Sequence, residues 1–393
     1  MSEHLFYRID PESTSYPRPI ASILPYLTYR QLRLRTPHLP YFLRTPHQFL
    51  RNSRTAIAQI LNSINLAVPV VLVPAYICKS VLEPIIWSGC RPLFYKLHRD
   101  LQIDCVDFRE KAQQAGAAIV THFFGMPQPM DEITSVCANS NLVMIEDCAH
   151  ALLGEHKGTP LGSFGDYAIA STVKFCPGVD GGILISKSEK SDWQHCQPSR
   201  KRSRLHSFVS LLDNSLYEHA ARFRLRSSVQ LHNIPDEPEW RQERVLQTEL
   251  APGHDGRYEY FDPDDLNIPG DPFSYWLLYH LDYDFMAKKR RENFLIYCRM
   301  LAQSSVCAPL YSSVPNGMIP YMFPLYVPDS MSAFRKLKYT GIPIWRWEQQ
   351  YIASPEPSVD FGFRLLHLPC HQCLDTVDIE RICAHMLRVL GEN

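Results

Sequence analysis

The chain has 393 residues, of which 45% are hydrophobic and 21% are charged. This balance is typical of a globular protein with room for about two or three domains, and it excludes fibrous and disordered classes. The formal net charge is −1, so no strong overall field directs the protein toward nucleic acid or an anionic membrane.

The N-terminal sequence and the cysteines predict a cytoplasmic protein. The first residues, MSEHLFYRIDPESTSY, lack the basic and apolar regions of a Sec-type signal. The most apolar stretch, residues 66–78, contains prolines and is too short to span a bilayer. The 12 cysteines are scattered singly along the chain, so we expect reduced, buried thiols rather than disulfides.

The first half of the chain predicts an arm followed by an α/β domain. Residues 1–45 are rich in proline, arginine and aromatic residues, and we expect an arm that lies over another surface. From about residue 46 the apolar residues follow helical spacing as far as Ile64. Strands that alternate with helices predict a domain over residues 46–187, with a mostly parallel sheet covered by helices on both faces. The predicted strands are 69–74, 93–97, 117–121, 142–146, 167–171 and 182–186, and helices are predicted at 78–88 and 129–140.

The second half predicts a connecting region and a smaller domain. Residues 188–270 are more polar and are expected to form helices and loops. Their basic cluster RKRSR (200–204) indicates a solvated face more than a nucleic-acid site, because the chain as a whole is neutral. Residues 271–393 predict an α+β domain. Its expected elements are helices at 281–303, 330–340 and 376–390, the last ended by Gly391, and a strand at 321–327.

Two of the predicted strands end in residues that carry chemistry. Asp147 lies at the end of one apolar run, and His150 follows three residues later. Ser171 and Lys174 directly follow another. Because ligands bind at the carboxyl ends of strands in open α/β sheets, we expect these side chains to meet in one site. A buried lysine or carboxylate is costly unless its charge is shared or it is used covalently.

These residue types fit pyridoxal phosphate. Its aldehyde needs a lysine, here Lys174, and its pyridine nitrogen needs an acid, here Asp147, that keeps the ring protonated. Its phosphate needs hydroxyl groups and the N–H groups of a helix N-terminus. We predict that Ser171 and the segment Ser53, Arg54 and Thr55 bind the phosphate, and that His150 reaches the phenolic oxygen of the ring.

The sequence resembles the DegT-type aminotransferases, which are pyridoxal-phosphate enzymes of fold type I that often act on nucleotide-linked keto-sugars. The most specific segment is VMIEDCAHALLGEHKGTPLGSFGDYAIASTVKFCPGVDGG; others are RNSRTAIAQIL, VLVPAYICKSVLEPIIWSGCRPLFY, THFFGMPQPMDEI, KKRRENF and LPCHQCLDTVDIERI. The resemblance implies a three-layer α/β/α domain around a seven-stranded sheet. It implies Asp147 at the pyridine nitrogen, His150 at the phenolic oxygen, Ser171 at the phosphate and Lys174 as the Schiff-base lysine. It also implies a homodimer whose active site lies at the subunit interface.

The sequence differs from the better-known sugar aminotransferases in three places. Ser171 stands three residues before Lys174, where those enzymes usually have a spacing of five. Their Asn and Arg motif, donated across the dimer, is not visible in residues 188–230. Where they place an aromatic residue over the cofactor ring, this chain has Tyr76 or Cys78. These differences bear on the sugar substrate more than on the cofactor.

Each of these residues also has a structural interpretation. Asp147 is of a type that caps helices, Lys174 taken alone is typical of a surface lysine, and His150 is as typical of a core histidine. The sequence STVK (171–174) also matches the Ser-x-x-Lys of penicillin-binding enzymes, but their Lys-Thr-Gly and Ser-Asp-Asn motifs are absent from the sequence.

Two further motifs have open interpretations. CHQC (370–373) is a lone Cys-x-x-Cys without a second pair for zinc, so buried thiols near the last helix are favoured. Arg346, between Trp345 and Trp347, is a candidate for binding a substrate carboxylate or phosphate, and equally for stacking inside the small domain.

The function predicted from the sequence is amino-group transfer from an amino acid, with glutamate as the expected donor, to a carbonyl acceptor. The alternatives are another pyridoxal-phosphate reaction such as dehydration, and a non-catalytic member of the fold that binds or regulates. Family dehydratases replace the lysine with histidine, so Lys174 argues against the first. The pair of Lys174 and Asp147 argues against the second. The expected partners are small molecules and a second copy of the chain, with no nucleic acid and no membrane.

Overall fold

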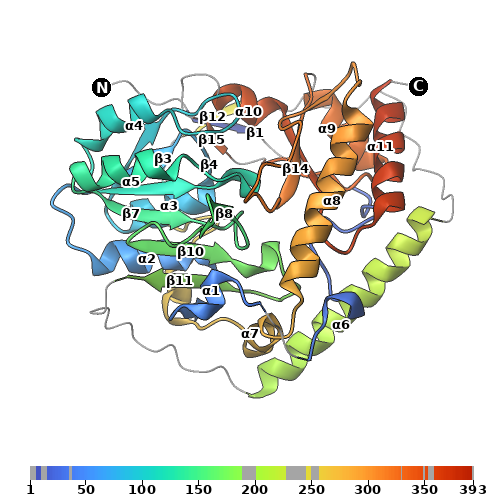
Figure 1. The fold of residues 1–393 in the computed structure, drawn as a ribbon, viewed down its shortest axis with the longest axis horizontal. Helices are drawn as coiled ribbons and strands as arrows, with labels where there is room; N and C mark the ends of the chain where they lie inside the picture. The colour runs from blue at the N-terminus through green and yellow to red at the C-terminus, as the bar shows by residue number, and fades with distance from the viewer. Residues whose placement is uncertain are drawn as a thin grey trace.

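The computed structural model describes residues 6–9, 16–34, 38–187, 201–226, 245–248, 256–328, 330–347, 350–352 and 358–391. Its centre is a seven-stranded sheet (Figure 1) in which the five strands from β10 to β5 are parallel and β11 is antiparallel to both neighbours. The strand order is β2 (Gln48–Leu50), β11 (Gly182–Ser186), β10 (Tyr167–Ser171), β7 (Val143–Asp147), β6 (Ala117–Thr121), β3 (Val70–Pro74) and β5 (Arg91–Tyr95).

The six strands predicted in this domain are all present, three of them with the predicted bounds. The helix predicted from about residue 46 is wrong at its start, because β2 occupies Gln48–Leu50 and pairs with β11. Helix α2 (Ser53–Ser63) begins only after Asn52, whose side chain accepts a hydrogen bond from the Thr55 N–H at 3.1 Å. An Asn at this position satisfies one of the free N–H groups of the first turn and fixes the helix start.

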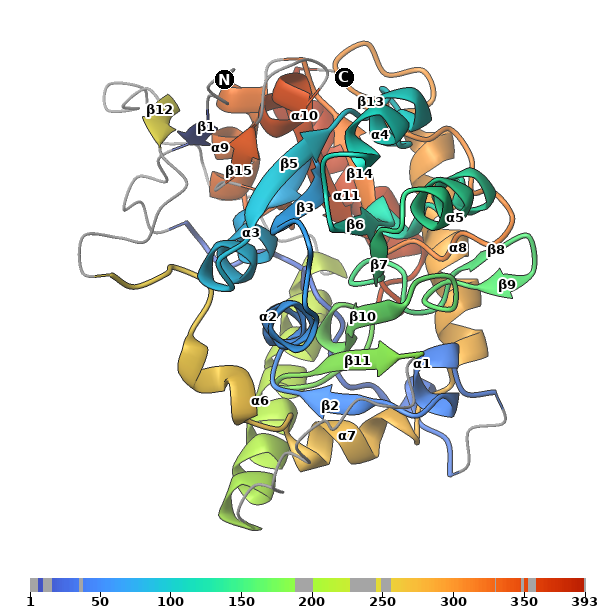
Figure 2. The same cartoon turned by 90° about the vertical axis from the view of Figure 1, so that its left-hand side faces the viewer.

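Helices cover both faces of the sheet, as predicted. Alternate residues of a strand point to opposite faces, so Val71 and Val73 pack with α2 and α3 (Lys79–Trp87), whereas Leu72 belongs to the larger core on the other side. That second core includes α5 (Met130–Asn139), which was predicted, and α4 (Cys105–Ala112), which was not. Figure 2 shows α2 and α3 on one side of the strands and α4 and α5 on the other.

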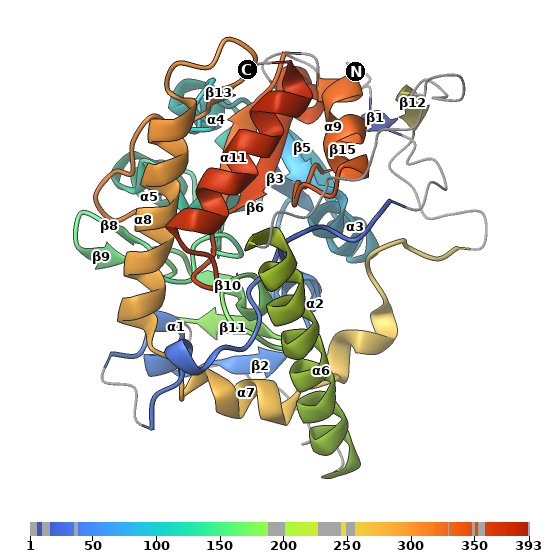
Figure 3. The same cartoon turned by 90° about the vertical axis from the view of Figure 1, so that its right-hand side faces the viewer.

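The C-terminal part is the expected mixture of helices and antiparallel strands, packed beside the central sheet (Figure 3). Its three-stranded sheet consists of β13 (Ala308–Pro309), β14 (Met322–Tyr326) and β16 (Leu365–Pro369). The helices α8 (Tyr283–Leu301), α9 (Ser330–Tyr339) and α11 (Thr376–Leu390) match the predicted segments. Helix α11 ends at Gly391, which has a left-handed φ of 90°, as the sequence predicted.

The connecting region contains α6 (Lys201–Arg226), a helix of 26 residues. The side chains of the basic cluster (200–204) lie outside the described residues. Part of the N-terminal arm lies against α6 of this region, where the Leu27 N–H donates to Ser215 Oγ at 3.1 Å. The arm also contacts the start of α8, where the Asp282 N–H donates to the Gln31 carbonyl at 2.8 Å.

The remaining elements are short. They are β1 (Phe6–Ile9) with β12 (Val245–Thr248), β4 (Tyr76–Cys78) with β15 (Gln350–Ile352), β8 (Glu155–His156) with β9 (Thr159–Pro160), and the helices α1 (Tyr41–Arg44), α7 (Pro272–Leu278) and α10 (Ser358–Arg364). Single helical turns are η1 (Tyr29–Gln31), η2 (Phe123–Gly125), η3 (Thr172–Lys174) and η4 (Pro263–Asn267). Within the described ranges, no helix is both long and apolar enough to cross a membrane.

Candidate active site

The carboxyl ends of β6, β7 and β10 border one pocket of about 520 Å³. This is the edge of a parallel sheet at which ligands bind. Residues from α2, α3, the segment 256–262 and the small C-terminal part complete the wall. The lining is Leu24, Ser53, Arg54, Ile57, Ile77, Cys78, Ser80, Val81, Thr121, Phe123, Asp147, Ala149, His150, Ile169, Val173, Lys174, Tyr260, Tyr321, Met322, Phe334, Lys338, Trp345, Arg346, Trp347 and His367.

Most of the predicted site residues line this pocket: Ser53, Arg54, Cys78, Asp147, His150, Lys174 and Arg346. Three others are not in the lining. Thr55 is fully buried and donates its hydroxyl to the Asn52 carbonyl at 2.7 Å, so its side chain is used within the first turn of α2. Tyr76 is 1% exposed and stacks on Trp347 with 4.9 Å between ring centroids. Ser171 is buried at the start of the turn that carries Lys174.

Asp147 is buried at the end of β7 with few donors around it. One oxygen accepts the Ala149 N–H at 3.0 Å, and the other accepts a long hydrogen bond of 3.4 Å from the Thr121 hydroxyl. Burial raises the pKa of Asp147, and the charge of Lys174 and these hydrogen bonds only partly oppose it. Among the described residues, Asp147 therefore forms no ion pair that offsets its burial, and a ligand cation would supply such a partner.

Lys174 follows β10 in the turn η3 and faces the same pocket. Its pKa is lowered by burial, while the nearby Asp147 acts to raise it. Its Nζ lies 5.4 Å from the centroid of the Tyr321 ring. A lysine amine whose pKa is lowered reacts more readily with a carbonyl group than an ordinary surface amine does.

His150 forms part of an aromatic wall next to Lys174. Its ring stacks on Tyr321 at 4.5 Å and lies 5.5 Å from Trp347 and 5.7 Å from Phe124. Burial, reinforced by the charge of Lys174, lowers the pKa of His150 well below its usual range. The imidazole is therefore neutral at pH 7, where it both donates and accepts hydrogen bonds.

His367, on β16, stands behind the same wall and was not predicted. Its ring lies edge-on to Phe124 at 4.8 Å and to Trp347 at 5.5 Å. Burial lowers its pKa to about 3, and neither ring nitrogen has a hydrogen-bond partner among the residues that the structure describes. Orphaned nitrogens bordering a pocket are typical of a site that receives a polar ligand group or water.

The N-terminus of α2 offers free N–H groups to this pocket through Ser53 and Arg54. The two glycines after Asp180 allow the approach of β11 to this turn. A Cβ on Gly182 would lie 2.3–2.5 Å from the backbone of Asn52 and Ser53, and one on Gly181 would lie 2.1 Å from the Thr172 hydroxyl. The double glycine therefore holds the helix start beside the Lys174 turn.

The lysine turn is fastened to the small C-terminal part by a buried arginine. Arg290 of α8 donates to the carbonyls of Lys174 at 3.2 Å and Phe175 at 3.3 Å, and to those of Pro320 and Tyr321 at 3.0 Å. Gln372 accepts from Arg290 at 2.9 Å and donates to the Phe175 carbonyl at 2.9 Å. One guanidinium thus sets the position of Lys174 relative to Tyr321.

Gln372, which bonds Arg290 and the Phe175 carbonyl, lies between the two cysteines of the CHQC motif. The motif therefore helps to hold the lysine turn. Cys370 and Cys373 are buried, as the sequence analysis favoured, and no metal ligands gather around them among the described residues. Arg346 is 3% exposed and lies over the Phe334 ring at 4.1 Å. It both stacks inside the small domain and borders the pocket, so the two interpretations of this residue are compatible.

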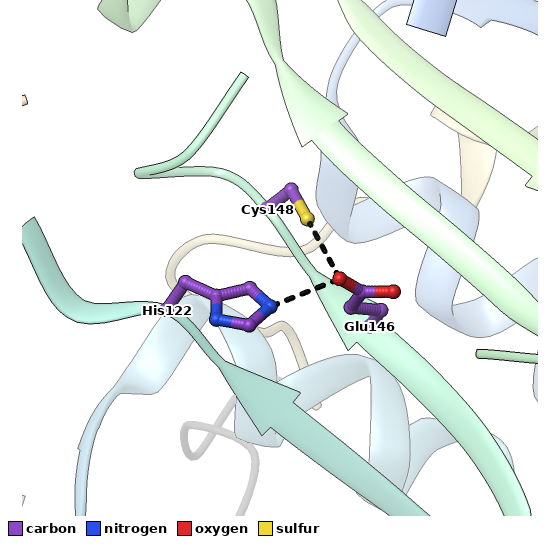
Figure 4. A group of neighbouring side chains, drawn as sticks. All are labelled: His122, Glu146 and Cys148. Atoms are coloured by element: carbon purple, nitrogen blue, oxygen red, sulfur yellow. Dashed lines mark hydrogen bonds and ion pairs between the residues drawn. The ribbon is translucent and has the colours of Figure 1, made fainter. Parts of the chain in front are cut away.

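His122, Glu146 and Cys148 form a buried group with the chemistry of metal ligands (Figure 4). Glu146 accepts from His122 Nε2 at 3.0 Å, from the N–H groups of Gly162 and Phe164 at 2.5 and 2.9 Å, and from Cys148 Sγ at 3.8 Å. His122 Nδ1 accepts from the backbone, so both ring nitrogens are used. Hydrogen bonds already occupy the nitrogen and oxygen atoms of His122 and Glu146 that would bind a metal. The group instead holds the 162–165 turn in place.

The sequence offered weak signals for the site residues that it missed. Arg290 lies in KKRRENF and Gln372 in CHQC, two segments that matched the family without an assigned role. Tyr321, His367 and Tyr260 come from elements far along the chain, so only the fold brings them to the pocket.

This architecture is also found in solved structures. A mostly parallel seven-stranded sheet between helical layers, with a smaller C-terminal part, is the fold of the fold type I pyridoxal-phosphate enzymes. The chain has this fold, as predicted, and shares it along almost its whole length with PseC of Helicobacter pylori. PseC is described as an aminotransferase involved in the biosynthesis of pseudoaminic acid. The two structures superpose with a TM-score of 0.60 at 15% sequence identity, over 96% of this chain and 99% of PseC.

Comparison of the sequence with known families finds one similarity. Residues 42–210 match the model of the DegT/DnrJ/EryC1/StrS aminotransferase family, which confirms the predicted resemblance over that segment. The GDP-perosamine synthase of Escherichia coli O157:H7 is 28% identical over 130 residues, which are 32% of this chain and 35% of the relative. Spr1654 of Streptococcus pneumoniae, solved in a PLP form, has a TM-score of 0.60 at 16% identity over 89% of this chain and 88% of its own. The matching stretches span about a third of the length of the first curated relatives.

Proposed function

We propose that the protein is a pyridoxal-phosphate-dependent aminotransferase. The observation that carries this proposal is the pair at the ends of β7 and β10. Asp147 is a buried acid whose pKa burial raises, and Lys174 is an amine whose pKa burial lowers. If Asp147 were only a helix cap and Lys174 only a surface lysine, neither pKa shift would have a function.

The residues of the pocket fit this cofactor. Asp147 would hold the protonated pyridine nitrogen, Lys174 the aldehyde carbon, and Ser53 with Arg54 the phosphate at the start of α2. His150 would lie against the ring or its phenolic oxygen. When bound, pyridoxal phosphate supplies an electron sink that stabilises negative charge at the carbon next to a substrate nitrogen.

The chain's own residues then account for transfer. Lys174, once exchanged for the amino group of a donor, is the base that takes the proton from the donor's α-carbon, because burial lowers the pKa of its amine and so favours the form without the extra proton. Asp147 stabilises positive charge on the pyridine nitrogen in a water-poor pocket, where such an interaction is strong. Arg290 holds the Lys174 turn, so the amine returns to the same place in both halves of the reaction.

The proposed donor is glutamate, and the proposed acceptor is a keto-sugar or a related biosynthetic carbonyl compound. In support, named relatives act on sugars, among them the UDP-4-amino-4,6-dideoxy-N-acetyl-β-L-altrosamine transaminase of Campylobacter jejuni, 25% identical over 156 residues. The pocket also combines aromatic rings, which stack on sugar faces, with the cations Lys338 and Arg346, which suit an anionic group. We further propose a homodimer with an interfacial site.

The test is the visible absorbance of purified protein supplied with pyridoxal phosphate, before and after addition of L-glutamate. We expect a yellow band that glutamate bleaches in the wild type, with 2-oxoglutarate released in equal amount. Lys174→Ala should show neither effect while keeping the circular dichroism spectrum of the wild type. Restoration of the band by nucleotide-linked keto-sugars, read by mass spectrometry of the amino-sugar product, would identify the acceptor.

The alternatives give different results. A protein that stays colourless with added pyridoxal phosphate would leave a binding or regulatory role for the fold and would contradict the proposal. A yellow protein that no amino donor bleaches would point to a different reaction of the same cofactor.

A further inference from the structure

Residues 256–262, here named the strap, lie against α3 on the pocket side of the central sheet. The strap appears in gold below α3 in Figure 2. Glu83 of α3 accepts its backbone N–H groups: Oε1 from Glu259 at 3.1 Å, and Oε2 from Tyr260 at 2.7 Å and Phe261 at 2.9 Å. A carboxylate that receives three backbone donors makes strong, charge-assisted hydrogen bonds. Glu83 therefore fixes the strap at its centre.

Packing around Glu83 reinforces this anchor. Glu83 is 3% exposed, and Lys79 bridges it at 3.5 Å to Glu259 of the strap at 3.0 Å. Phe261 is 2% exposed and packs on Trp87 of α3, with 5.2 Å between the ring centroids. Because a buried carboxylate is tolerated only when it is paired and hydrogen-bonded, removing these bonds costs stability and should release the strap.

The far end of the strap is fastened to α2. It leads into η4, where Asp265 pairs with Arg51 at 2.7 Å and accepts from the Asn52 amide at 3.3 Å. Gln59 of α2 donates to the Leu266 carbonyl at 2.6 Å. Arg51 and Asn52 directly precede the start of α2, so the strap is held beside the helix end that offers its N–H groups to the pocket.

Tyr260 lies at the middle of the three residues that Glu83 holds, and it lines the pocket together with Ser53, Arg54 and Ser80. Its backbone N–H is held by Glu83, so its phenol is delivered to a defined place. The other strap tyrosine, Tyr258, is not in the lining and packs toward Phe261 instead. The strap thus carries a pocket tyrosine and, two residues away, a matched tyrosine outside the pocket.

We propose that Tyr260 is a binding residue that donates its hydroxyl to a phosphate group held at the start of α2, and that Glu83 is the residue that positions it. This inference rests on the proposed function, which supplies a phosphate to the pocket. The shared chemistry is a phosphate oxygen, whether it belongs to the cofactor or to a nucleotide-linked substrate. A tyrosine hydroxyl and the N–H groups of a helix start are both suitable donors to such an oxygen.

The experiment compares the affinities of the apo forms of the wild type, Tyr260→Phe and Tyr258→Phe for pyridoxal phosphate and for pyridoxal, by protein fluorescence. Tyr260→Phe should bind pyridoxal phosphate about tenfold more weakly, with pyridoxal affected by less than about twofold, because only the first ligand has a phosphate. Tyr258→Phe should match the wild type. The affinities of the same proteins, loaded with cofactor, for GDP and UDP show whether Tyr260 binds a substrate phosphate.

Glu83→Gln tests the positioning role through a structural readout. Loss of the charge should loosen the strap, so trypsin should cut after Arg257 faster than in the wild type, and affinity for pyridoxal phosphate should fall as it does in Tyr260→Phe.

Weaker binding of GDP or UDP alone would support the tyrosine–phosphate contact and assign it to the substrate. Unchanged affinity of Tyr260→Phe for all three phosphate ligands would overturn the inference while leaving the proposed function intact. A wild type that binds no pyridoxal phosphate would overturn both.

Discussion

Glu146 and Asp147 are adjacent buried carboxylates whose surroundings differ completely. Because neighbouring residues of a strand face opposite sides, Glu146 enters the group shown in Figure 4 and Asp147 enters the pocket. Burial acts to raise the pKa of Glu146, but hydrogen bonds from His122 and the 162–165 turn outweigh it, and the pKa falls. For Asp147 burial prevails, and the pKa rises.

The different surroundings give these two consecutive carboxylates different roles. Side-chain and backbone donors of the chain itself bind Glu146, so this carboxylate stabilises the fold. The chain leaves Asp147 with one backbone N–H and one long hydroxyl contact, so the charge of this carboxylate is available to a ligand cation. The account therefore predicts that mutations at the two positions have opposite effects on activity and on stability.

Asp147→Asn should have the largest effect on activity. An amide cannot stabilise a protonated pyridine nitrogen, and we expect the half-reaction with glutamate to slow by about 10²–10³-fold. The apo protein should be at least as stable as the wild type at pH 7. Because the folded pKa of Asp147 lies above its usual value of 3.8, its ionisation opposes folding at neutral pH, and the advantage of Asn should vanish as the pH falls below that usual value.

Urea unfolding of the apo proteins at several pH values measures this effect, with stopped-flow absorbance for the half-reaction. An Asp147→Asn protein that is less stable than the wild type at pH 7 and transfers amino groups at the same rate would contradict this role of Asp147.

Glu146→Gln should show the reverse pattern. The loss of the charge leaves the donors of His122 and Gly162 poorly satisfied, and the free energy of unfolding should fall by about 2–4 kcal/mol at pH 7. Since the folded pKa of Glu146 is depressed, its contribution is complete above the unfolded value of 4.5 and is lost as the pH falls through the folded value. The two proteins should therefore converge in stability in acid. At saturating cofactor the rate of the half-reaction should change by less than about threefold.

Arg290→Gln sharpens the comparison by loosening the lysine turn without touching the pocket chemistry. We expect a rate of the half-reaction about tenfold lower, because Lys174 is less well placed, and a lower stability. The neighbouring Arg291 bonds the carbonyls of Val314, Pro315 and Met318, away from the lysine turn. Arg291→Gln is thus the control: it should lower stability and spare the rate, and equal rates in both variants would argue against the positioning role.

Thr121→Val should have the smallest effect. It removes only the hydrogen bond of 3.4 Å to Asp147, and at that length the expected change in the half-reaction is about two- to threefold. A spectrophotometric titration of the bound cofactor would show whether the pKa of its ring nitrogen changes. A loss as large as that of Asp147→Asn would mean that the hydroxyl, rather than the carboxylate, carries the charge interaction.

Local patterns predicted the strands well, because short apolar runs follow from residues next to each other in the chain. The two predicted site residues at strand ends, Asp147 and Lys174, line one pocket. The prediction failed at β2, where Phe49 and Leu50 suit a helix as well as a strand and the cap at Asn52 decides. It did not foresee the role of Glu146, which depends on N–H groups 16–19 positions away. Arg290, Tyr321 and Tyr260 could not be placed, since only the tertiary fold brings them to Lys174.

The most direct test of the central claim is to reduce the protein with borohydride after loading it with pyridoxal phosphate, and to locate the attached group by mass spectrometry of its peptides. The account predicts one phosphopyridoxyl group, on Lys174, in the wild type, and a greatly reduced yield on that lysine in Asp147→Asn at limiting cofactor. Attachment to a different lysine, or none at all, would contradict the assignment of the pocket between β7 and β10 as the cofactor site.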